Sequence, residues 1–293
     1  DDTFIEMKGI GKQYGGVTAL DNVDFQVKTG EAISLAGENG SGKSTLIKIL
    51  VGVEQPTFGQ IFIDGKSYSQ LTPRLAAASG ISVIFQDFSL FSNLTVAENI
   101  AFAAQLSEKK RLFDRAATLR IAQEALDRIG VNINLDSRVE TLPVAHKQLV
   151  AICRGLASNA RLIIMDEPTT ALTGREVQAL LSIIRKLKDS GIAVVFVSHK
   201  LAEVLEVCEE VFVLRNGKNA AQGPARDFDA ASLTRHMTGR EISEAKPPLN
   251  IDQAKNLLVV DQLGKEGAFS DINFKLKEGE VLGISGVLGS GRT

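Results

Sequence analysis

Short apolar runs alternate with stretches of helical period over most of the first 240 residues. The runs that fit strands lie at 4–7, 23–27, 31–37, 60–64, 81–86, 161–168 and 192–200. Helical period appears at 44–51, at 201–210 and at 176–191, where the stretch ends at a glycine. Strands that alternate with helices indicate a mainly parallel sheet covered on both faces. The pattern therefore predicts an α/β fold.

A block of helical period interrupts this alternation between about residue 88 and residue 156. It contains LTVAENIAFAAQL, which has a threonine-led start, and RAATLRIAQEALDRIG, which ends in a glycine. Beyond the later strands, residues 211–223 fit a β-hairpin with Asn216 and Gly217 at its turn. We therefore expect a helical insertion within the α/β fold and a hairpin near its end.

The sequence repeats itself after a polar stretch. Residues 241–255, EISEAKPPLNIDQAK, contain two adjacent prolines and are typical of a linker. The following residues match residues 18–44 without a gap at a constant offset of 249. The matched pairs include Ala19 with Ala268, Phe25 with Phe274, Gly37 with Gly286 and Gly42 with Gly291. We expect one domain over 1–240, a linker over 241–256, and over 257–293 the start of a second domain, truncated at its phosphate loop.

Composition narrows the class of protein. Apolar residues make up 44% of the 293 residues, charged residues 23%, and the formal charge is −2, so no broad basic field favours nucleic acid. The longest apolar runs fall far short of the ~18 residues that a membrane helix requires. Cys153 and Cys208 are too far apart in sequence for a disulfide framework or a metal knuckle, so we expect buried, reduced thiols. The start of the chain lacks a signal-peptide pattern, and these features together favour a cytoplasmic protein.

Residues 37–45, GENGSGKST, contain the full phosphate-loop pattern Gly-x4-Gly-Lys-Ser. The loop follows a predicted buried strand and opens a predicted helix, so its backbone N–H groups and the helix N-terminus can surround phosphates. Lys43 would place a charge between the phosphates, and the Ser44 hydroxyl could bind Mg²⁺. The expected nucleotide contacts are Gly37, Glu38, Asn39, Gly40, Ser41, Gly42, Lys43, Ser44 and Thr45. The alternative is a plain glycine turn between a strand and a helix, and such a turn would not require all of these residues.

Carboxylates end the predicted strand RLIIMDEP. Asp166 and Glu167 lie at its carboxyl end, which in a parallel sheet of this kind is beside the phosphates. Asp166 would hold Mg²⁺ through water, and Glu167 could polarise the attacking water as general base. An acidic loop start is the alternative interpretation, and the upstream phosphate loop argues against it.

Two further polar residues end predicted core strands. His199 closes IAVVFVS, where a contact with the γ-phosphate is expected, although a lone histidine is more often a packed or surface residue. Gln86 ends ISVIFQ at the border of the helical block. Its amide oxygen could bind Mg²⁺ and report the nucleotide state to that block, whereas by itself it would be an ordinary polar residue.

These motifs together resemble the ATP-binding subunit of ABC transporters over the whole chain. Residues 37–45 match Walker A, Gln86 the Q-loop, LIIMDE Walker B, TALT the D-loop and His199 the switch histidine. Tyr14 occupies the adenine-stacking position of the family. The resemblance implies ATP and Mg²⁺ as cofactors and a P-loop NTPase fold: a RecA-like core, an antiparallel β subdomain, and a helical subdomain at about 88–156 that contacts a membrane partner.

The finer resemblance is to the ATPases of simple-sugar importers for ribose, galactose or xylose. In that group two ATPase domains are fused and the second carries GRT, which Gly291, Arg292 and Thr293 match. This resemblance implies transmembrane permease subunits, an indirect link to a periplasmic or extracellular sugar-binding protein, and a second ABC domain in the same chain or in a homodimer. It also implies a peripheral location on the cytoplasmic face of the cell membrane.

One motif departs from the family. Its signature Leu-Ser-Gly-Gly-Gln falls at 142–146, where this chain has Leu-Pro-Val-Ala-His. Pro143 lacks the hydroxyl that would bond a γ-phosphate, and it also lacks a backbone donor. Such an altered signature would face the altered second loop in a head-to-tail dimer, so the resemblance implies one active and one impaired ATP site.

Two other functions compete with sugar import. A soluble tandem ABC ATPase that acts on ribosomes or DNA usually keeps lysine in both loops and an intact signature, and Arg292 and Pro143 argue against it. A kinase or GTPase with a phosphate loop lacks support, because no guanine-reading Asn-Lys-x-Asp follows.

Overall fold

The computed structural model describes residues 2–107, 114–198, 200–240 and 254–285. By its contacts the chain divides into two units, Asp1–Ile242 and Ser243–Thr293, and each is described by itself. The strands of the first unit are β1 Thr3–Tyr14, β2 Val17–Lys28, β3 Ala32–Ala36, β4 Phe58–Ile63, β5 Lys66–Tyr68, β6 Ile81–Ile84, β7 Leu162–Asp166, β8 Ala193–Val197, β9 Glu210–Arg215 and β10 Lys218–Pro224. Its helices are α1 Lys43–Leu50, α2 Pro73–Ala78, α3 Val96–Ser107, α4 Arg115–Ile129, α5 Val144–Ala157, α6 Gly174–Asp189, α7 Leu201–Val207 and α8 Ala230–Thr238, with short 3₁₀ turns η1 Val139–Thr141 and η2 Ala225–Asp227.

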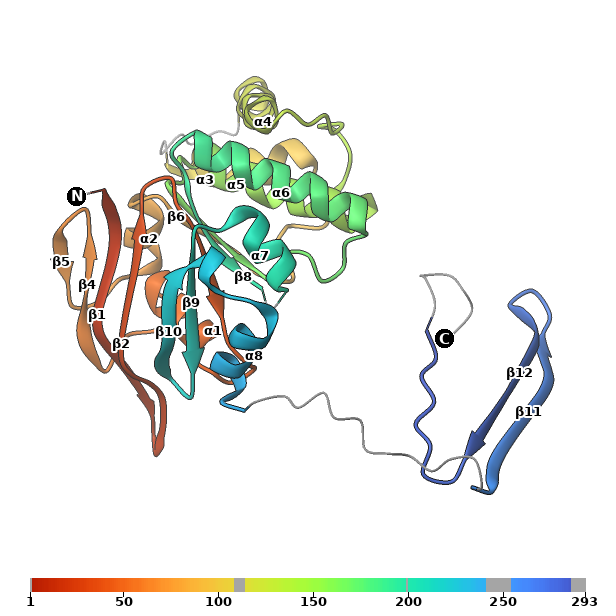
Figure 1. The fold of residues 1–293 in the computed structure, drawn as a ribbon. Coiled ribbons are helices and arrows are strands. Elements are labelled where there is room, and N and C mark those ends of the chain that lie inside the picture. The colour runs from red at the N-terminus through yellow and green to blue at the C-terminus, as the bar shows by residue number, and fades with distance from the viewer. Residues whose placement is uncertain (1, 108–113, 199, 241–253, 286–293) are drawn as a thin grey trace. The chain divides into compact units, whose positions relative to one another are not determined.

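A six-stranded sheet forms the centre of the first unit (Figure 1). Its strand order is β10-β9-β3-β8-β7-β6, and β9, β3, β8, β7 and β6 run parallel. Only β10 is antiparallel, because it returns from β9 through the Asn216-Gly217 turn, where both residues have positive φ. The parallel sheet and the hairpin predicted from the sequence are confirmed.

The central sheet separates two hydrophobic cores. In β8, Val194 and Phe196 point into one core, and Ala193, Val195 and Val197 point into the other. The first core is completed by side chains from α3, α4, α5, α6 and α7. The second is completed by α1 and by a separate antiparallel sheet of order β2-β1-β4-β5. Coverage of both faces explains why every residue of β3 and β8 is buried.

Within the described residues, the helical block between β6 and β7 contains three α-helices and the 3₁₀ turn η1. The α-helices are α3, α4 and α5, which pack on one another beside the central sheet (Figure 1). Asp114 caps α4 by accepting from the N–H groups of Ala116 and Ala117, and Gly130 ends it at a φ of 71°. The glycine end predicted for this helix is confirmed.

The second unit consists, within the described residues, of the antiparallel hairpin β11 Asn256–Lys265 and β12 Phe269–Lys277. In the repeat it corresponds to β1 and β2. After the hairpin, Leu282 and Ile284 correspond to Ile33 and Leu35 of β3, and they are 40% and 67% exposed, whereas Ile33 and Leu35 are each 1% exposed. Gly291, Arg292 and Thr293 lie outside the described residues.

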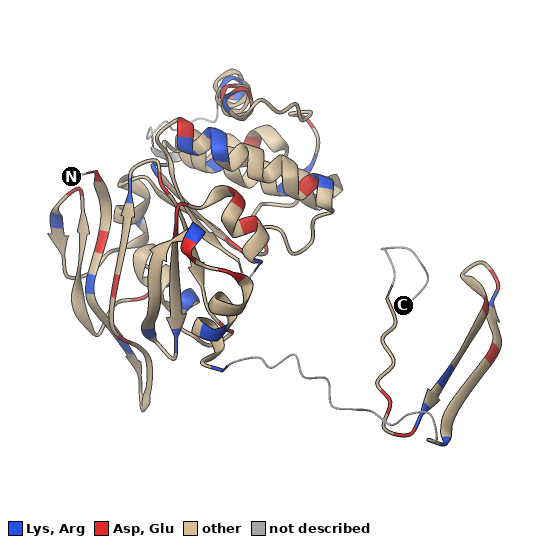
Figure 2. Cartoon of the chain, in the orientation of Figure 1, with Lys and Arg blue, Asp and Glu red and all other residues tan. Residues whose placement is uncertain are grey.

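Charged side chains of both signs are distributed over the helices and strands (Figure 2). Within the described ranges, no helix is long and apolar enough to cross a bilayer.

The two cysteines are free and buried, as predicted. Burial raises the pKa of the Cys153 thiol to about 12 and also raises that of Cys208. Neither thiol is therefore ionised at neutral pH, and both behave as small apolar side chains.

Candidate functional site

The phosphate loop connects the carboxyl end of β3 to the first residue of α1. Gly42 precedes the helix at a φ of 110°, and its carbonyl oxygen accepts the N–H of Leu46 at 2.9 Å. At Gly37 a Cβ would lie 2.4 Å from the carbonyl oxygen of Leu214, and at Gly42 it would lie 2.9 Å from that of Ala19. Both positions therefore need glycine for space as well as for backbone conformation.

A cavity of about 440 Å³ opens above this loop. Its lining comes from β2, the loop, the first turn of α1, the turn after β6 and the carboxyl end of β7, and comprises Ala19, Asn39, Gly40, Gly42, Lys43, Ser44, Thr45, Gln86, Asp166 and Glu167. The structure thus brings together three motifs that are separated in sequence, the phosphate loop, Gln86 and the pair Asp166 and Glu167. Gly37, Glu38 and Ser41 do not line the cavity, and Ala19 of β2 is a lining residue that the sequence did not reveal.

Lys43 curls back over the loop. Its Nζ donates to the carbonyl oxygens of Gly37 at 2.7 Å and Glu38 at 2.9 Å. Burial lowers the pKa of this ammonium group, and the carboxylates of Glu167 and Asp166 oppose that effect. The charge is therefore held at the floor of the cavity, close to two acidic side chains.

Asp166 and Glu167 form the acidic wall of the cavity. Burial raises the pKa of Asp166, the charge of Glu167 raises it further, and Lys43 opposes both. Glu167 has a φ of 46°, a conformation that costs a non-glycine residue of the order of 1–3 kcal/mol. Its N–H donates to the Val197 carbonyl oxygen at 3.0 Å, and Thr170 Oγ1 donates to its Oε2 at 3.3 Å. The turn that carries Glu167 is thus stabilised by a hydrogen bond to β8 and by a hydrogen bond between two of its own residues.

The lining fits a phosphate chain with Mg²⁺. Gly40 lines the cavity, and a Cβ there would meet nothing within 4 Å, so the loop is open at this position. Behind it, the buried Ser41 hydroxyl has no hydrogen-bond partner among the described residues. Ser44, Gln86 and Asp166 supply only oxygen ligands, which Mg²⁺ prefers. No group of three or more His, Cys, Asp or Glu suits a metal ion in the described part of the chain, and a Mg²⁺ site shared with phosphates needs none.

Tyr14 ends β1 outside this cavity. The residue is 44% exposed, and its partner across the hairpin, Val17, is also exposed. Lys12 Nζ lies 4.8 Å from the ring centroid, donates to the Gln55 carbonyl oxygen at 2.7 Å and pairs with Glu54 at 3.0 Å. The ring is therefore supported by a fixed cation and has exposed surface left for a ligand.

The segment after Gln86 is held by an arginine that the sequence analysis missed. Phe88 and Ser89 have φ values of 61° and 46°, two successive left-handed residues. Arg154 of α5 donates from Nη2 to the Phe88 carbonyl oxygen at 3.1 Å and from Nη1 to that of Ser89 at 2.7 Å. Burial lowers the pKa of this guanidinium. The helix that follows the signature is thereby linked to the Gln86 turn.

The altered signature forms the start of α5. Pro143 is its N-cap residue, with φ −58° and ψ 156°, and provides no side-chain cap. The buried amide of Gln148, one turn further, has no hydrogen-bond partner among the described residues. His199, predicted to contact the γ-phosphate, lies outside the described residues.

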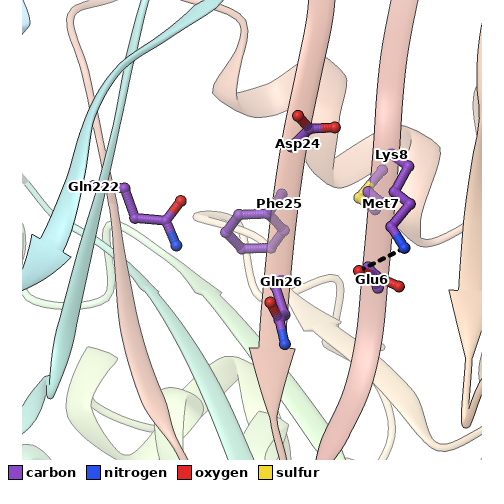
Figure 3. Close-up of a pocket in the computed structure, with 7 residues that line it drawn as sticks. All are labelled: Glu6, Met7, Lys8, Asp24, Phe25, Gln26 and Gln222. Carbon is purple, nitrogen blue, oxygen red and sulfur yellow. Dashed lines mark ion pairs between the residues drawn. The ribbon is translucent and has the colours of Figure 1, made fainter.

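A second cavity, of about 360 Å³, lies on β1 and β2 (Figure 3). Glu6 and Lys8 form an ion pair of 3.0 Å on one side of it, and Gln222 of β10 lies on the other. It has neither a glycine loop nor a helix N-terminus, so it offers no comparable cradle for phosphates.

The family follows from a sequence comparison. The profile of the family described as ABC transporter matches residues 20–170, slightly more than half of the chain. This chain belongs to the ABC transporter family. The matched range contains the phosphate loop, Gln86, Asp166 and Glu167.

Curated relatives include import ATP-binding proteins. "Ribose import ATP-binding protein RbsA 1" of Rubrobacter xylanophilus is 44% identical over 99% of this chain and 58% of its own length. "Galactose/methyl galactoside import ATP-binding protein MglA 1" of Photobacterium profundum is 38% identical over 100% of this chain and 59% of its own length. The chain therefore spans somewhat more than half the length of these relatives.

Solved structures agree on the fold. The ATP-binding cassette MJ0796, in a dimeric post-hydrolysis state bound to ADP and Pi, is similar with a TM-score of 0.66 and 29% identity, over 76% of this chain and 100% of that one. MJ1267, an ATP-binding cassette of an ABC transporter, gives a TM-score of 0.70 and 26% identity over 80% of this chain and 94% of that one. The predicted P-loop NTPase fold is confirmed.

Proposed function

We propose that this chain binds MgATP in the 440 Å³ cavity and hydrolyses it. Lys43 and the loop N–H groups hold the β- and γ-phosphates, while Ser44, Gln86 and Asp166 hold Mg²⁺, which neutralises charge that develops on the phosphates. Glu167 acts as general base on the attacking water. The observation that carries this proposal is the convergence of the phosphate loop, Gln86 and the two carboxylates on one cavity.

We assign the remaining predicted contacts to the same nucleotide. Tyr14 supplies a stacking surface for adenine, and Gly37, Glu38 and Ser41 shape the loop from behind. His199 contacts the γ-phosphate. Titration with MgATP tests the site: binding that is lost in Lys43→Ala supports it, and equal binding by both proteins overturns it.

We propose that hydrolysis powers the import of a simple sugar. The relatives named for ribose and for galactose import support this function, and they offer no support for action on ribosomes or DNA. The proposed partners are transmembrane permease subunits, a sugar-binding protein outside the membrane that acts indirectly, and a second ABC domain. The proposed location is the cytoplasmic face of the membrane.

The helical block supplies a surface for the permease. A cavity of about 880 Å³ lies where α2 faces α3, α4 and α5, and its lining combines small side chains such as Ala78, Ala103 and Ala157 with Arg74 and Arg128. Small side chains leave room for an inserted element, and the arginines favour an acidic one. In membrane vesicles that contain the intact protein and its permease, ribose or galactose should accumulate only when ATP is present on the side of the membrane where the ATPase lies. Uptake without ATP would contradict the proposal.

We propose further that residues 257–293 begin a second ABC domain and that the two ATP sites differ. The supporting observations are the repeat and the N-cap position of Pro143, which provides no hydroxyl at the start of α5. In a head-to-tail arrangement this signature faces the second loop, so one site hydrolyses ATP and the other mainly holds it. Two bound nucleotides per intact protein with single-site turnover would support this; equal turnover at both sites would contradict it.

A further inference from the structure

A buried carboxylate in α7 has no place among the residues that line the ATP cavity. Glu203 is 9% exposed, and its Oε2 accepts the Thr169 hydroxyl at 2.6 Å and, more weakly, the Ser198 hydroxyl at 3.4 Å. Its Oε1 pairs with Lys200 Nζ at 3.1 Å. A buried charge is costly unless such partners compensate it, so the arrangement needs an explanation.

The two hydroxyl donors belong to the segments that follow β7 and β8. Thr169 is 2% exposed and lies two residues after Glu167, whereas Ser198 is 5% exposed and directly follows β8. Thr170, next to Thr169, donates to the Glu167 carboxylate. One carboxylate therefore joins the turn that carries Glu167 to the end of the neighbouring strand.

We propose that Glu203 is a positioning residue for the hydrolysis step. Through Thr169 it fixes the turn after β7, and this turn orients the Glu167 carboxylate toward the attacking water. The left-handed φ of Glu167 is unfavourable in isolation, so surrounding contacts must maintain it. The inference rests on the proposed role of Glu167 as general base.

A purely structural role is the alternative. Glu203 lies in the first turn of α7, where the helix dipole favours an acidic side chain. That role requires no bond to Thr169, which lies 34 positions away in sequence and donates through a short, charge-assisted hydrogen bond. The two roles differ in what they predict for kcat.

Four variants of the intact protein separate them: Glu203→Ala, Glu203→Gln, Thr169→Val and the double variant Thr169→Val/Glu203→Ala. We expect Glu203→Ala and Thr169→Val each to lower kcat by about 10- to 100-fold with an unchanged Kd for MgATP, because misplacement by about 1 Å has such effects. The double variant should be no slower than either single variant, because both remove one contact. Glu203→Gln keeps an acceptor oxygen and should recover most of kcat.

Glu206→Gln is the matched control. It lies on the same helix, where its carboxylate is bonded to Gln178 and Arg185 on the outside of the unit, and we expect wild-type kcat. If Glu203→Ala does not fold, Thr169→Val still carries the test, since it replaces one hydroxyl with a methyl group.

Wild-type kcat in Thr169→Val, or additive losses in the double variant, would overturn the inference. A lower melting temperature with unchanged kcat would show a structural role instead. If Glu167→Gln itself left kcat unchanged, the proposed function of Glu167 would fail first. If Glu167→Gln lowered kcat and Thr169→Val did not, only the role of Glu203 would fail.

Discussion

Replacing Tyr14 with alanine removes the exposed ring at the end of β1 while leaving the phosphate cavity intact. Stacking of a base on an aromatic side chain is worth about 1–3 kcal/mol, so the Kd for ATP should rise about 5- to 150-fold. GTP should weaken similarly, because stacking tolerates any base. Tyr14 lies outside the cavity lining, so contacts with the phosphates should not change.

Lys12→Met tests whether the ring is preorganised. The substitution keeps an unbranched side chain one heavy atom shorter but removes the cation 4.8 Å from the Tyr14 ring centroid and its bonds to Gln55 and Glu54. Without these contacts the Tyr14 side chain would have to be ordered when ATP binds. This ordering costs about 0.5–1.5 kcal/mol of binding free energy, so the Kd for ATP should rise about 2- to 12-fold.

Lys8→Met is the control for the loss of a cation from β1. Lys8 lies on the same strand, 5.0 Å from the Phe62 ring centroid, and pairs with Glu6 beside the second cavity (Figure 3). The Lys8→Met variant should bind ATP with the affinity of the wild type.

Calorimetric titration with MgATP and with inorganic tripolyphosphate, which has no base, separates the contribution of the base to the affinity from that of the phosphates. All three variants should bind tripolyphosphate with wild-type affinity. An unchanged ATP Kd in Tyr14→Ala would refute the stacking role. An equal loss of tripolyphosphate affinity would show that the residue acts through the fold.

Three further outcomes follow from single contacts. Lys43→Ala should abolish hydrolysis and sharply weaken MgATP binding, because the phosphates lose their main cation; wild-type turnover measured by phosphate release would remove the assignment. Arg154→Met should lower the free energy of unfolding by about 2–4 kcal/mol and disturb the turn after Gln86, because the carbonyl oxygens of Phe88 and Ser89 lose a charged, half-buried donor; denaturant titration would show this, and a change within 0.5 kcal/mol would contradict it. Arg161 lowers the pKa of the exposed Asp64 carboxyl from 3.8, so this pair contributes stability above that value and loses it as pH falls through the lowered pKa. Asp64→Asn should therefore cost at most about 1 kcal/mol at pH 7 and nothing in strong acid, and a pH-independent cost would contradict this origin.

Features encoded by neighbouring residues could be predicted from the sequence. The strands β3, β7 and β8 are mainly apolar runs, and the phosphate loop specifies its own glycines and the helix that follows. The sequence predicts that Asp166 and Glu167 lie beside the phosphate loop, because the carboxyl ends of parallel strands meet at one edge of the sheet, and both line the cavity.

Contacts between distant segments could not be predicted in the same way. The bonds of Arg154 to the turn after Gln86 and of Glu203 to Thr169 join residues more than 30 positions apart, so no local pattern marks them. The short helix α2 was missed although Thr72 and Pro73 form a recognisable start, because its six residues carry too little period to detect.

The central claim is that one cavity binds MgATP and that Glu167 acts there as the base. Glu167→Gln tests it most directly, with kcat measured by phosphate release and Kd by titration in the same preparation of intact protein. We predict a fall in kcat of roughly 10²-fold or more with the affinity for MgATP retained, because catalysis and binding are separate roles. A collapse in affinity, or wild-type turnover, would contradict it.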